Sequence, residues 1–339
     1  MAQTSPSPKP SATLKDVARL AGVSTAVVSY VVNGGPKNVS PASEAKVREA
    51  IRMLGYRPNA AARALRNRSI EMLGIIVPDA TNPFFAALAH AVEEAAASRG
   101  YALTIANSGH SLAVERRLVE NLASRRVDGV FLCSVLPEPD LRELESAEIP
   151  AVLLNHTGQE GARYSVGIDL ADGARTAVRH LVEHGHTRIG LIMGSLVGGV
   201  LDGREIGWRQ ALEEAGLPPG PVMRGAFTRE GGYEAGKQFL GSSERPTAVF
   251  ASSDLQAVGF LRSLHDGGIR VPEDVAVVSF DGSKEAEYSV PRLTTVAQPV
   301  EEMARAAVEA LLGDGGSEHG RTFVGTLVLR ASCGCRADH

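Results

Sequence analysis

One stretch of the chain comes close to a phosphate-binding loop. Residues Gly231–Gln238 read GGYEAGKQ and differ at one position from the Gly-rich P-loop pattern, whose backbone N–H groups hold phosphates. Gln238 stands where that pattern needs a Ser or Thr to bind Mg²⁺. The residues from Glu234 to Leu240 also have the composition of a helix body. We therefore expect no nucleotide hydrolysis from this stretch.

A second group has the spacing of zinc ligands. His180, Glu183 and His184 fit the H-x-x-E-H pattern of one class of zinc peptidases. Leu181 and Val182 stand where a helix that packs on a sheet needs apolar residues. The histidines then fall in its last turn, where cations interact favourably with the helix dipole. We expect no metal site here, and the absence of G-x-S-x-G and G-x-G-x-x-G motifs predicts no catalytic residue and no cofactor.

Polar side chains follow several apolar runs. Asp79, Asn155, Ser253-Asp254 and Asp281 each follow a predicted strand within three residues of its end. Ligands of open α/β sheets bind beyond the carboxyl ends of the strands, so these side chains are candidates for a binding site. A helix N-cap is the commonest alternative for an Asp in this place, and for Asp254 the two interpretations are equally good.

Arg204 adds a cation to this group. It begins a helix after a glycine-rich loop, and a guanidinium opposite a carboxylate such as Asp281 supplies paired donors and acceptors. That pairing suits adjacent hydroxyl groups of a sugar. Phe84, Phe227 and Phe280 are available to stack on the apolar face of such a ligand.

Strands that alternate with helices must position these side chains. The apolar runs form two series: Met72–Val77, Tyr101–Ala106, Val130–Cys133 and Ala151–Leu154, then Ser165–Ile168, Ile189–Met193, Ala248–Ala251 and Val275–Phe280. Amphipathic stretches lie between them, such as Phe84–Arg99, which Gly100 closes. This order is typical of parallel sheets covered by helices, and two series predict two α/β lobes.

The charge of the chain is divided unevenly. The net charge of the 339 residues is −4, but residues 12–68 hold ten Lys/Arg and three Asp/Glu, a balance of +7. Residues 69–339 hold 24 basic and 36 acidic side chains, a balance of −12. A basic segment on an acidic body indicates a polyanion partner for the basic segment alone.

The basic segment carries the caps of three short helices. Thr13 and Asp16 form a capping box, and Gly22 ends the first helix. Ser24 is the N-cap of the second helix, and Ser40-Pro41 opens a third that ends at Gly55. The side chains predicted to be buried include Val27, Val28, Val31 and Val32 in the second helix and Val47, Ile51 and Leu54 in the third. Two short helices joined by a tight glycine turn form a helix-turn-helix unit; an ordinary three-helix cluster is the alternative.

An alanine-rich stretch follows. Asn59–Asn67 is predicted to be a short helix with Asn59 as N-cap, marginal alone in water and stabilised by a partner helix and phosphates. Leu65 is its one large apolar side chain, and such a side chain can insert into a minor-groove base step. The alternative is a linker helix with Leu65 packed inward.

Taken in order, these segments resemble the LacI/GalR (lac-repressor-type) family of bacterial transcription regulators. The matching stretches are Thr13–Asn33, Tyr56–Leu65, Ile75–Phe85, Arg204–Trp208, Ser253-Asp254, Phe280-Asp281 and Pro291–Val296. The similarity covers residues 13–331. It implies an α/β protein with an N-terminal helix-turn-helix headpiece, a hinge helix and a two-lobed periplasmic-binding-protein-like body.

The resemblance also assigns residues to sites. Thr25–Asn33 corresponds to the recognition helix in the major groove, with Leu65 as the minor-groove wedge. The implied DNA-binding residues are Ser24, Thr25, Ala26, Ser29, Tyr30, Asn33, Asn59, Ala62 and Leu65. The implied effector-binding residues are Asp79, Phe84, Asn155, Arg204, Phe227, Asp254 and Asp281. Tyr30 stands where many members carry Arg, which removes a bidentate guanine contact, so an operator sequence does not transfer from relatives.

The expected domain boundaries follow from the same reading. They are a disordered tail (1–11), a helix-turn-helix domain (12–57), a hinge helix (58–70), a body (71–331) and a second tail (332–339). The two lobes of the body are expected to comprise residues 71–167 with 298–326, and residues 168–297 with 327–331.

The implied function is that of a homodimeric repressor. Its implied partners are a near-palindromic double-stranded DNA operator and a small effector. The effector is expected to be a mono- or disaccharide, with a purine base as the alternative. No leucine heptad follows the pair of strands expected near Thr322–Leu329, so a dimer is favoured over a tetramer. A sugar-binding receptor of a transporter is the alternative from another class, and an enzyme ranks third.

The compartment is expected to be the cytoplasm. No apolar run approaches the ~18 residues of a membrane span, and the Ser/Pro-rich N-terminus lacks the apolar segment of a secretory signal. Three cysteines, Cys133, Cys333 and Cys335, do not make a disulfide framework. We expect Cys333 and Cys335 to lie in a flexible tail.

Overall fold

The computed structural model describes residues 12–33, 39–57, 69–134, 139–155, 164–194, 201–313 and 320–335. It divides the chain into a unit that ends at Ile70, here called the head, and a unit that begins at Glu71, the body. The predicted hinge helix, with Asn59, Ala62 and Leu65, lies outside the described residues. Among the helices that are described, none combines the length and apolar character that crossing a membrane requires.

The head contains the three predicted helices, α1 (Leu14–Ala21), α2 (Thr25–Asn33) and α3 (Pro41–Leu54). The capping box of α1 is formed: Asp16 N donates to Thr13 Oγ1 at 3.3 Å, and Thr13 N donates to the Asp16 carboxylate at 3.0 Å. Ser24 Oγ accepts a hydrogen bond from Val27 N at 3.3 Å and so caps α2. The predicted starts of the three helices are confirmed.

A small apolar cluster holds the head together. Val17, Val28 and Val47, one from each helix, are fully buried at its centre. Leu54 was expected in this core, but 37% of its surface is exposed, so that prediction is wrong. The reason is local: the chain reverses at Gly55 directly after it, and Tyr56 packs against the cluster.

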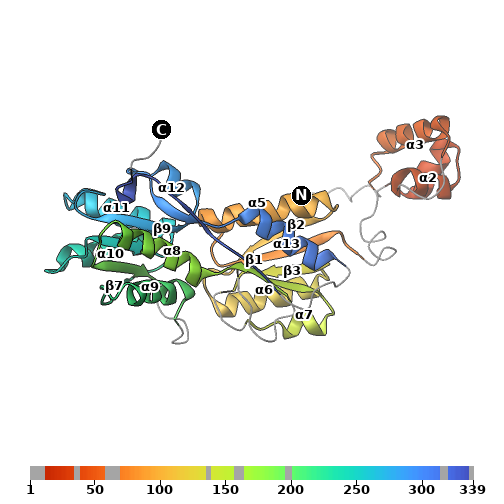
Figure 1. Cartoon of the computed structure of the whole chain (residues 1–339). Helices are drawn as coiled ribbons and strands as arrows, with labels where there is room; N and C mark the ends of the chain where they lie inside the picture. Colours follow the sequence, from red (N-terminus) through yellow and green to blue (C-terminus); the bar gives the residue numbers. More distant parts are fainter. Residues whose placement is uncertain are drawn as a thin grey trace, which may run out of the picture. The chain divides into compact units, whose positions relative to one another are not determined.

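The described residues of the body form two six-stranded sheets, each covered by helices (Figure 1). The sheet of the first lobe has the order β11-β5-β4-β3-β1-β2, and that of the second lobe has the order β12-β10-β9-β8-β6-β7. The strands of the first lobe are β1 (Met72–Val77), β2 (Ala102–Asn107), β3 (Gly129–Leu132), β4 (Ala151–Leu154), β5 (Ser165–Ile168) and β11 (Arg321–Phe323). Those of the second lobe are β6 (Ile189–Met193), β7 (Val222–Arg224), β8 (Ala248–Ala251), β9 (Ala276–Asp281), β10 (Thr294–Ala297) and β12 (Thr326–Val328).

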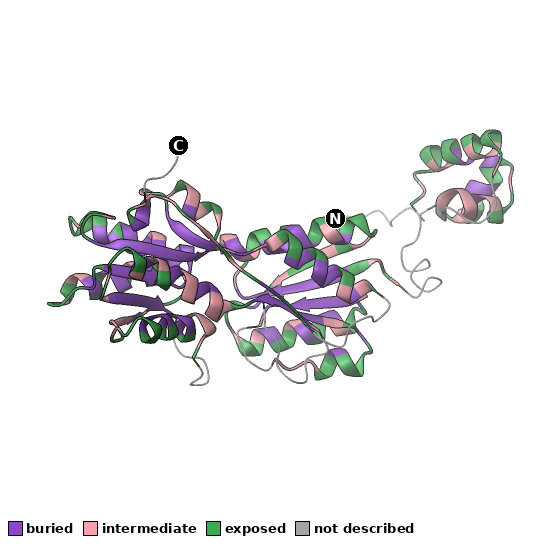
Figure 2. Cartoon of the chain, viewed as in Figure 1, coloured by how far each residue is buried: buried purple, intermediate pink, exposed green. Residues whose placement is uncertain are grey.

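Helices pack on these sheets. The first lobe has α5 (Pro83–Ser98), α6 (Leu112–Ser124), α7 (Arg142–Ser146) and α13 (Val300–Leu312). The second lobe has α8 (Leu170–Glu183), α9 (Gly203–Glu214), α10 (Arg229–Gly241), α11 (Asp254–Asp266), α12 (Lys284–Tyr288) and the 3₁₀ turn η1 (Ala331–Cys333). Figure 2 shows buried inner strands and helices exposed on their outer sides. The predicted two-lobed α/β fold class is confirmed.

Among the strands of the described residues, the pairings are parallel with one exception. The pairing of β10 with β12 is antiparallel, whereas the other pairings between strands are parallel. The two strands expected near Thr322–Leu329 do not pair with each other, because β11 joins the first sheet and β12 joins the second. Two further strands, β7 and β10, were not predicted.

Within the described residues, the chain passes between the lobes at three places. These are the connections from β5 to α8, from β10 to α13 and from β11 to β12. Each connection is at most two residues long. Because β5 lies beside β11 and β10 lies beside β12 in the two sheets, these connections lie close together.

The C-terminal segment does not begin a flexible tail at residue 332. Ser332 and Cys333 are buried in η1. Ser332 Oγ donates to the Val277 carbonyl at 2.6 Å and accepts from Thr294 N at 2.9 Å. The expectation of a flexible segment around Cys333 and Cys335 is therefore wrong, because a buried hydroxyl fastens this turn to two strands.

The stretch that resembles a P-loop lies in helix α10, as its composition predicted. Its glycines let α10 and α11 pack with their backbones in contact. A Cβ atom on Gly232 would lie 1.9 Å from the Gln256 carbonyl oxygen, and one on Gly259 would lie 1.8 Å from that of Arg229. The glycines thus have a packing role that explains their presence without a phosphate.

This packing yields a test. Gly259→Ala should lower the free energy of unfolding by about 1–3 kcal/mol or more, because the added methyl group forces the two helices apart. Gly241→Ala, at the end of α10 with open space around its Cβ position, is the matched control and should be neutral or slightly stabilising. Urea denaturation of the two variants measures the difference. Equal stability of both variants would contradict the close packing of α10 on α11.

Candidate functional site

A cleft of about 510 Å³ opens between the two lobes of the body. Its walls come from the carboxyl ends of strands in both sheets and from the helices that follow them. Five of the seven predicted effector-binding residues line it: Phe84, Asn155, Arg204, Phe227 and Asp281. The volume is that of a site for a small organic molecule.

Strand ends explain why these side chains meet. Asn155 follows β4 and has a φ of 58°, and Asp281 is the last residue of β9, with a φ of 116°. Positive φ is uncommon outside glycine, and Asn and Asp tolerate it best. Phe84 lies in the first turn of α5, where its N–H donates to the Asn82 side chain at 3.0 Å.

Arg204 is the best-anchored polar side chain of the cleft. Its Nε and Nη2 groups each donate to the carboxylate of Asp202 at 2.9 Å, and Nη1 donates to the Ser252 carbonyl at 2.8 Å. A guanidinium has five N–H groups, so two of them have no partner among the described residues. Asp202, which also caps α9, was not predicted as the partner of Arg204.

Aromatic rings enclose the guanidinium. Its central carbon lies 5.0 Å from the ring centre of Phe227 and 5.7 Å from that of Phe280. Phe227 lines the cleft, but Phe280 is fully buried behind it. The expectation that Phe280 stacks on a ligand is therefore wrong, because this ring packs under Arg204 instead.

Asp281 and Gln298 form the floor beside Arg204. Gln298 Nε2 donates to Asp281 Oδ1 at 3.1 Å. Gln298 Oε1 is buried and accepts no hydrogen bond from the described residues, although Gln298 lines the cleft. A buried acceptor without a donor is costly, so this oxygen is poised for a hydroxyl or N–H of a ligand. Burial and the nearby Asp254 carboxylate raise the pKa of Asp281 well above its ordinary value, although Arg204 opposes this.

Asp254 is not among the residues that line the cleft. Its carboxylate accepts hydrogen bonds from Ser279 Oγ at 2.6 Å, from Thr295 Oγ1 at 2.8 Å and from both N and Oγ of Ser283, at 2.6 and 2.8 Å. Ser253, not Asp254, is the N-cap of α11. Asp254 therefore joins α11 to two strands and to α12, which is neither of the roles predicted for it.

Asp79 is the other predicted effector-binding residue that lies outside the lining of the cleft. It does not line the cleft, and its carboxylate accepts from Thr81 N at 2.8 Å and Thr81 Oγ1 at 2.7 Å. Burial opposes ionisation of this group, but these hydrogen bonds outweigh it and lower the pKa of Asp79. Asp79 shapes the turn that leads into α5.

A second cation lines the cleft and was not predicted. Arg224, at the end of β7, pairs with Glu205 at 2.6 Å, and its Nη1 donates to the Gly194 carbonyl at 3.0 Å. Glu205 is fully buried and also pairs with Arg209 at 2.8 Å. The other lining residues that were missed include Asn82, Phe85, His110, Ser134, Leu170, Asp202 and Gln298. Most lie in loops or at helix starts, where no periodic pattern marks them.

Helix α2 of the head carries most of the predicted DNA-binding residues. Ser24, Thr25 and Ala26 are exposed, and Ser29 and Tyr30 are half-buried. Asn33 is the last residue of α2, and its side chain lies outside the described part. The start of α2 thus presents small and polar side chains to solvent.

The pKa of Asp281 is raised and that of Asp79 is lowered, and this difference gives a test of the charges in and beside the cleft. A raised folded-state pKa means that Asp281 contributes stability that is present below about pH 4 and is lost as the pH rises through the raised value. Asp281→Asn should therefore make the free energy of unfolding fall less than in the parent chain as the pH rises above about 4. Denaturant titrations at several pH values measure this slope.

Asp79→Asn is the matched control. Because the pKa of Asp79 is lowered, its contribution is present at neutral pH and lost as the pH falls through the folded-state pKa. This variant should be less stable at neutral pH and should not reduce the loss at rising pH. If the free energy of unfolding of Asp281→Asn depends on pH as that of the parent chain does, the raised pKa of the Asp281 carboxyl group is contradicted.

Comparison with known proteins places both units. Residues 13–59 match the family described as bacterial regulatory proteins, lacI family, and residues 178–333 match the periplasmic binding protein-like domain. The chain is 36% identical over 303 residues to catabolite control protein A of Priestia megaterium, covering 88% of this chain and 91% of that protein. It is 38% identical over 306 residues to the HTH-type transcriptional repressor PurR of Yersinia pestis, covering 89% of each.

Solved structures agree with these relatives. The transcriptional regulator CelR–cellobiose complex has a TM-score of 0.69 and 36% identity, covering 95% of this chain and 99% of that one. The lac repressor dimer bound to operator and the anti-inducer ONPF has a TM-score of 0.83 and 27% identity, covering 96% and 99%. The chain therefore belongs to the lacI family of bacterial regulatory proteins.

Proposed function

We propose that this chain is a transcriptional repressor that binds a near-palindromic operator as a homodimer. A small sugar held in the cleft lowers or raises its affinity for the operator. The observation that carries the sugar assignment is the set of unused polar atoms around Arg204. Two guanidinium N–H groups of Arg204 have no partner among the described residues, and Asp281 is close enough to act on the Arg204 charge. Gln298 Oε1, which has no described donor, belongs to a residue that lines the same cleft.

The chemistry of this set suits vicinal hydroxyls. Each sugar hydroxyl donates one hydrogen bond and accepts others, so a pair of them satisfies a guanidinium and a carboxylate together. Phe84 and Phe227 supply apolar surface for the C–H face of the ring. The CelR structure, which is similar along almost the whole chain, is a complex with cellobiose, and this supports a saccharide as the effector class.

The head supplies the DNA-binding part of the proposal. Its +7 balance over residues 12–68 favours phosphates, and the exposed start of α2 is suited to the major groove. Thr25, Ala26, Ser29 and Tyr30 are the proposed base-edge or phosphate contacts, and Ser24 and Asn33 the proposed phosphate contacts. The proposed hinge, residues 58–70, joins this head to the body and contributes Leu65 as the minor-groove wedge. A regulator of chromosomal DNA works in the cytoplasm.

The cleft is proposed to act on the operator through the connections between lobes. Gln298 lies in the segment that joins β10 to α13, one of the three crossings, and it also lines the cleft. A ligand that bonds to Gln298 and to Arg204 therefore has a differential affinity for different lobe angles. Such a difference is what an effector needs in order to shift an equilibrium between two states.

The test uses the full chain, DNA from its own promoter region and a panel of sugars and nucleobases. Arg204→Ala should weaken binding of the active sugar by about 100-fold, as expected for lost hydrogen bonds from a charged donor, while operator affinity without effector is unchanged. Calorimetry measures the first quantity and gel shifts the second. Arg204→Lys, which keeps a charge beside Asp202 but loses the planar fork, should show the same separation.

Arg209→Ala is the matched control on the same helix. Arg209 pairs with Glu205 and does not line the cleft, so this variant should respond to the sugar as the parent chain does. Loss of operator binding and of sugar binding together in both Arg204 variants would assign Arg204 a structural role. Sugar binding without any operator binding would favour a solute receptor, and a response to nucleobases alone would overturn the sugar assignment.

A further inference from the structure

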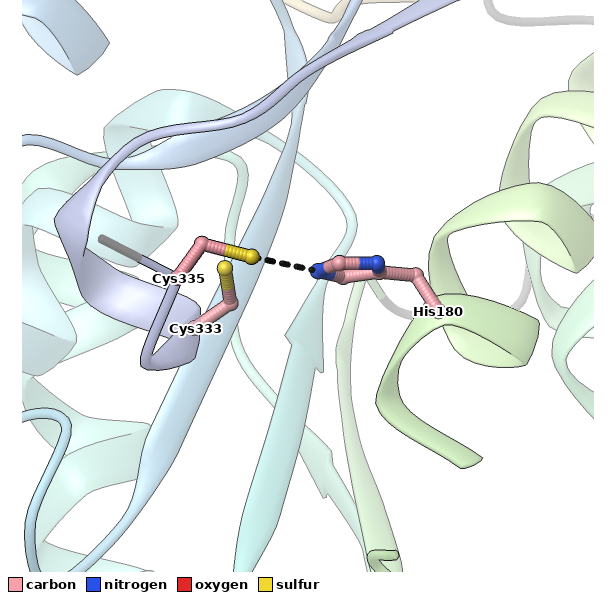
Figure 3. Close-up of side chains that lie close together, drawn as sticks. All are labelled: His180, Cys333 and Cys335. Carbon is pink, nitrogen blue, oxygen red and sulfur yellow. Dashed lines mark hydrogen bonds between the residues drawn. The ribbon is translucent and has the colours of Figure 1, made fainter. Parts of the chain in front are cut away.

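Two histidines and two cysteines meet at the C-terminal end of α8. Cys335 Sγ lies 3.6 Å from His180 Nε2 and 3.5 Å from His184 Nε2. The ligand atoms of His180, Cys333 and Cys335 all lie within 4.8 Å of one another. In Figure 3 the side chains of Cys333 and Cys335 point from the C-terminal turn toward the His180 ring.

The histidines are held one helical turn apart. His180 and His184 are four residues apart at the end of α8, and their ring centres are 4.4 Å apart. Residues at i and i+4 of a helix share a face, so both Nε2 atoms are directed to the same side. This is the pair that the sequence showed in an H-x-x-E-H pattern.

The cysteines are held by the turn η1. The buried Ser332 fastens this turn to β9 and β10, and Thr294 Oγ1 donates to Cys333 Sγ at 3.0 Å. Gly334 has a φ of 89°, a conformation that glycine adopts without strain and that turns the chain between the two cysteines. The thiols thus come from a segment fixed in place, about 150 residues along the chain from the histidines.

The spacing of Cys335 from the two histidines fits a tetrahedral zinc ion. With Zn–S bonds of about 2.3 Å and Zn–N bonds of about 2.0 Å, neighbouring sulfur and nitrogen ligands of a tetrahedron lie about 3.5 Å apart. The two sulfur–nitrogen distances of Cys335, 3.5 and 3.6 Å, agree with this value. We propose that His180, His184, Cys333 and Cys335 form a Cys₂His₂ site that binds Zn²⁺.

This site is separate from the cleft. Leu170, the first residue of α8, lines the cleft, and His180 lies ten residues further on, about 15 Å along the helix. Two thiolates and two imidazoles select zinc over the harder Mg²⁺ and Ca²⁺. The ion would join the C-terminal turn to α8 within the second lobe, and a ligand bound only by the folded state stabilises it.

The test uses the untagged full chain, reduced and freed of metal. Titration with Co²⁺, a spectroscopic substitute for Zn²⁺, should give the visible d–d bands of a tetrahedral ion and a thiolate charge-transfer band, saturating at one ion per chain. Zn²⁺ should displace the Co²⁺ and raise the melting temperature. The double variant C333S/C335S should lose these bands and bind Zn²⁺ at least about 100-fold more weakly.

His184→Gln guards against misfolding of the cysteine variant. His184 is exposed, so its substitution leaves the core intact, and it should also lose the tetrahedral bands. Two controls carry the same residue types outside the cluster: H186Q, whose histidine contacts Thr247 Oγ1 at 3.0 Å, and C133A, whose cysteine is buried in the first lobe. Both should bind Co²⁺ as the parent chain does.

Several results would overturn the proposal. Uptake that does not saturate at one ion per chain, or weak octahedral bands, would indicate adventitious binding. Tetrahedral bands that persist in C333S/C335S would place the ion elsewhere. A Cys333–Cys335 disulfide that dioxygen re-forms once the reductant is removed, and that prevents metal uptake, would make the pair a redox element instead.

Discussion

The hydrogen bond from Gln298 to Asp281 joins the floor of the cleft to a connection between the lobes. Gln298 lies just after β10, where the chain crosses from the second lobe to the first, and Asp281 ends the neighbouring strand β9. The crossings are short, so the lobes can rotate about them only if contacts near the crossings rearrange. Gln298 keeps one buried acceptor without a donor from the described residues. A ligand that donates a hydrogen bond to this oxygen acts on a residue of the connection between the lobes. The proposed mechanism depends on Gln298 holding both positions, in the cleft and in the connection.

Buried charged side chains lie around the hydrogen bond between Gln298 and Asp281, and their burial determines the energetic cost of this arrangement. Arg204 is paired with Asp202 and enclosed by Phe227 and Phe280, so its charge is compensated before any ligand arrives. Asp281 is less well compensated, because burial and the nearby Asp254 carboxylate raise its pKa. The second lobe thus holds one rigid cation and one destabilised carboxylate side by side. Sites of this kind commonly trade stability for function.

Much of the scaffold could be predicted because buried parallel strands are continuous apolar runs. Met72–Val77 and Ile189–Met193 were predicted with their observed bounds for this reason. β10 was missed because its buried Thr294 and Thr295 use their hydroxyls for hydrogen bonds and break the apolar pattern. In the cleft, strand ends located Asn155 and Asp281, yet the same rule also selected Asp254, which joins structural elements instead. The cluster of His180 with Cys335 could not be predicted, because it depends on where the C-terminal turn packs.

The central claim is that ligand occupancy of the cleft and operator binding are two sides of one equilibrium. Thermodynamic linkage then requires the same factor in both directions. The direct measurement is the affinity of the chain for its effector, by calorimetry, with and without saturating operator DNA, beside the operator affinity with and without saturating effector. The account predicts two equal factors in the parent chain, both well away from one. Effector affinity that is identical with and without the operator would contradict it.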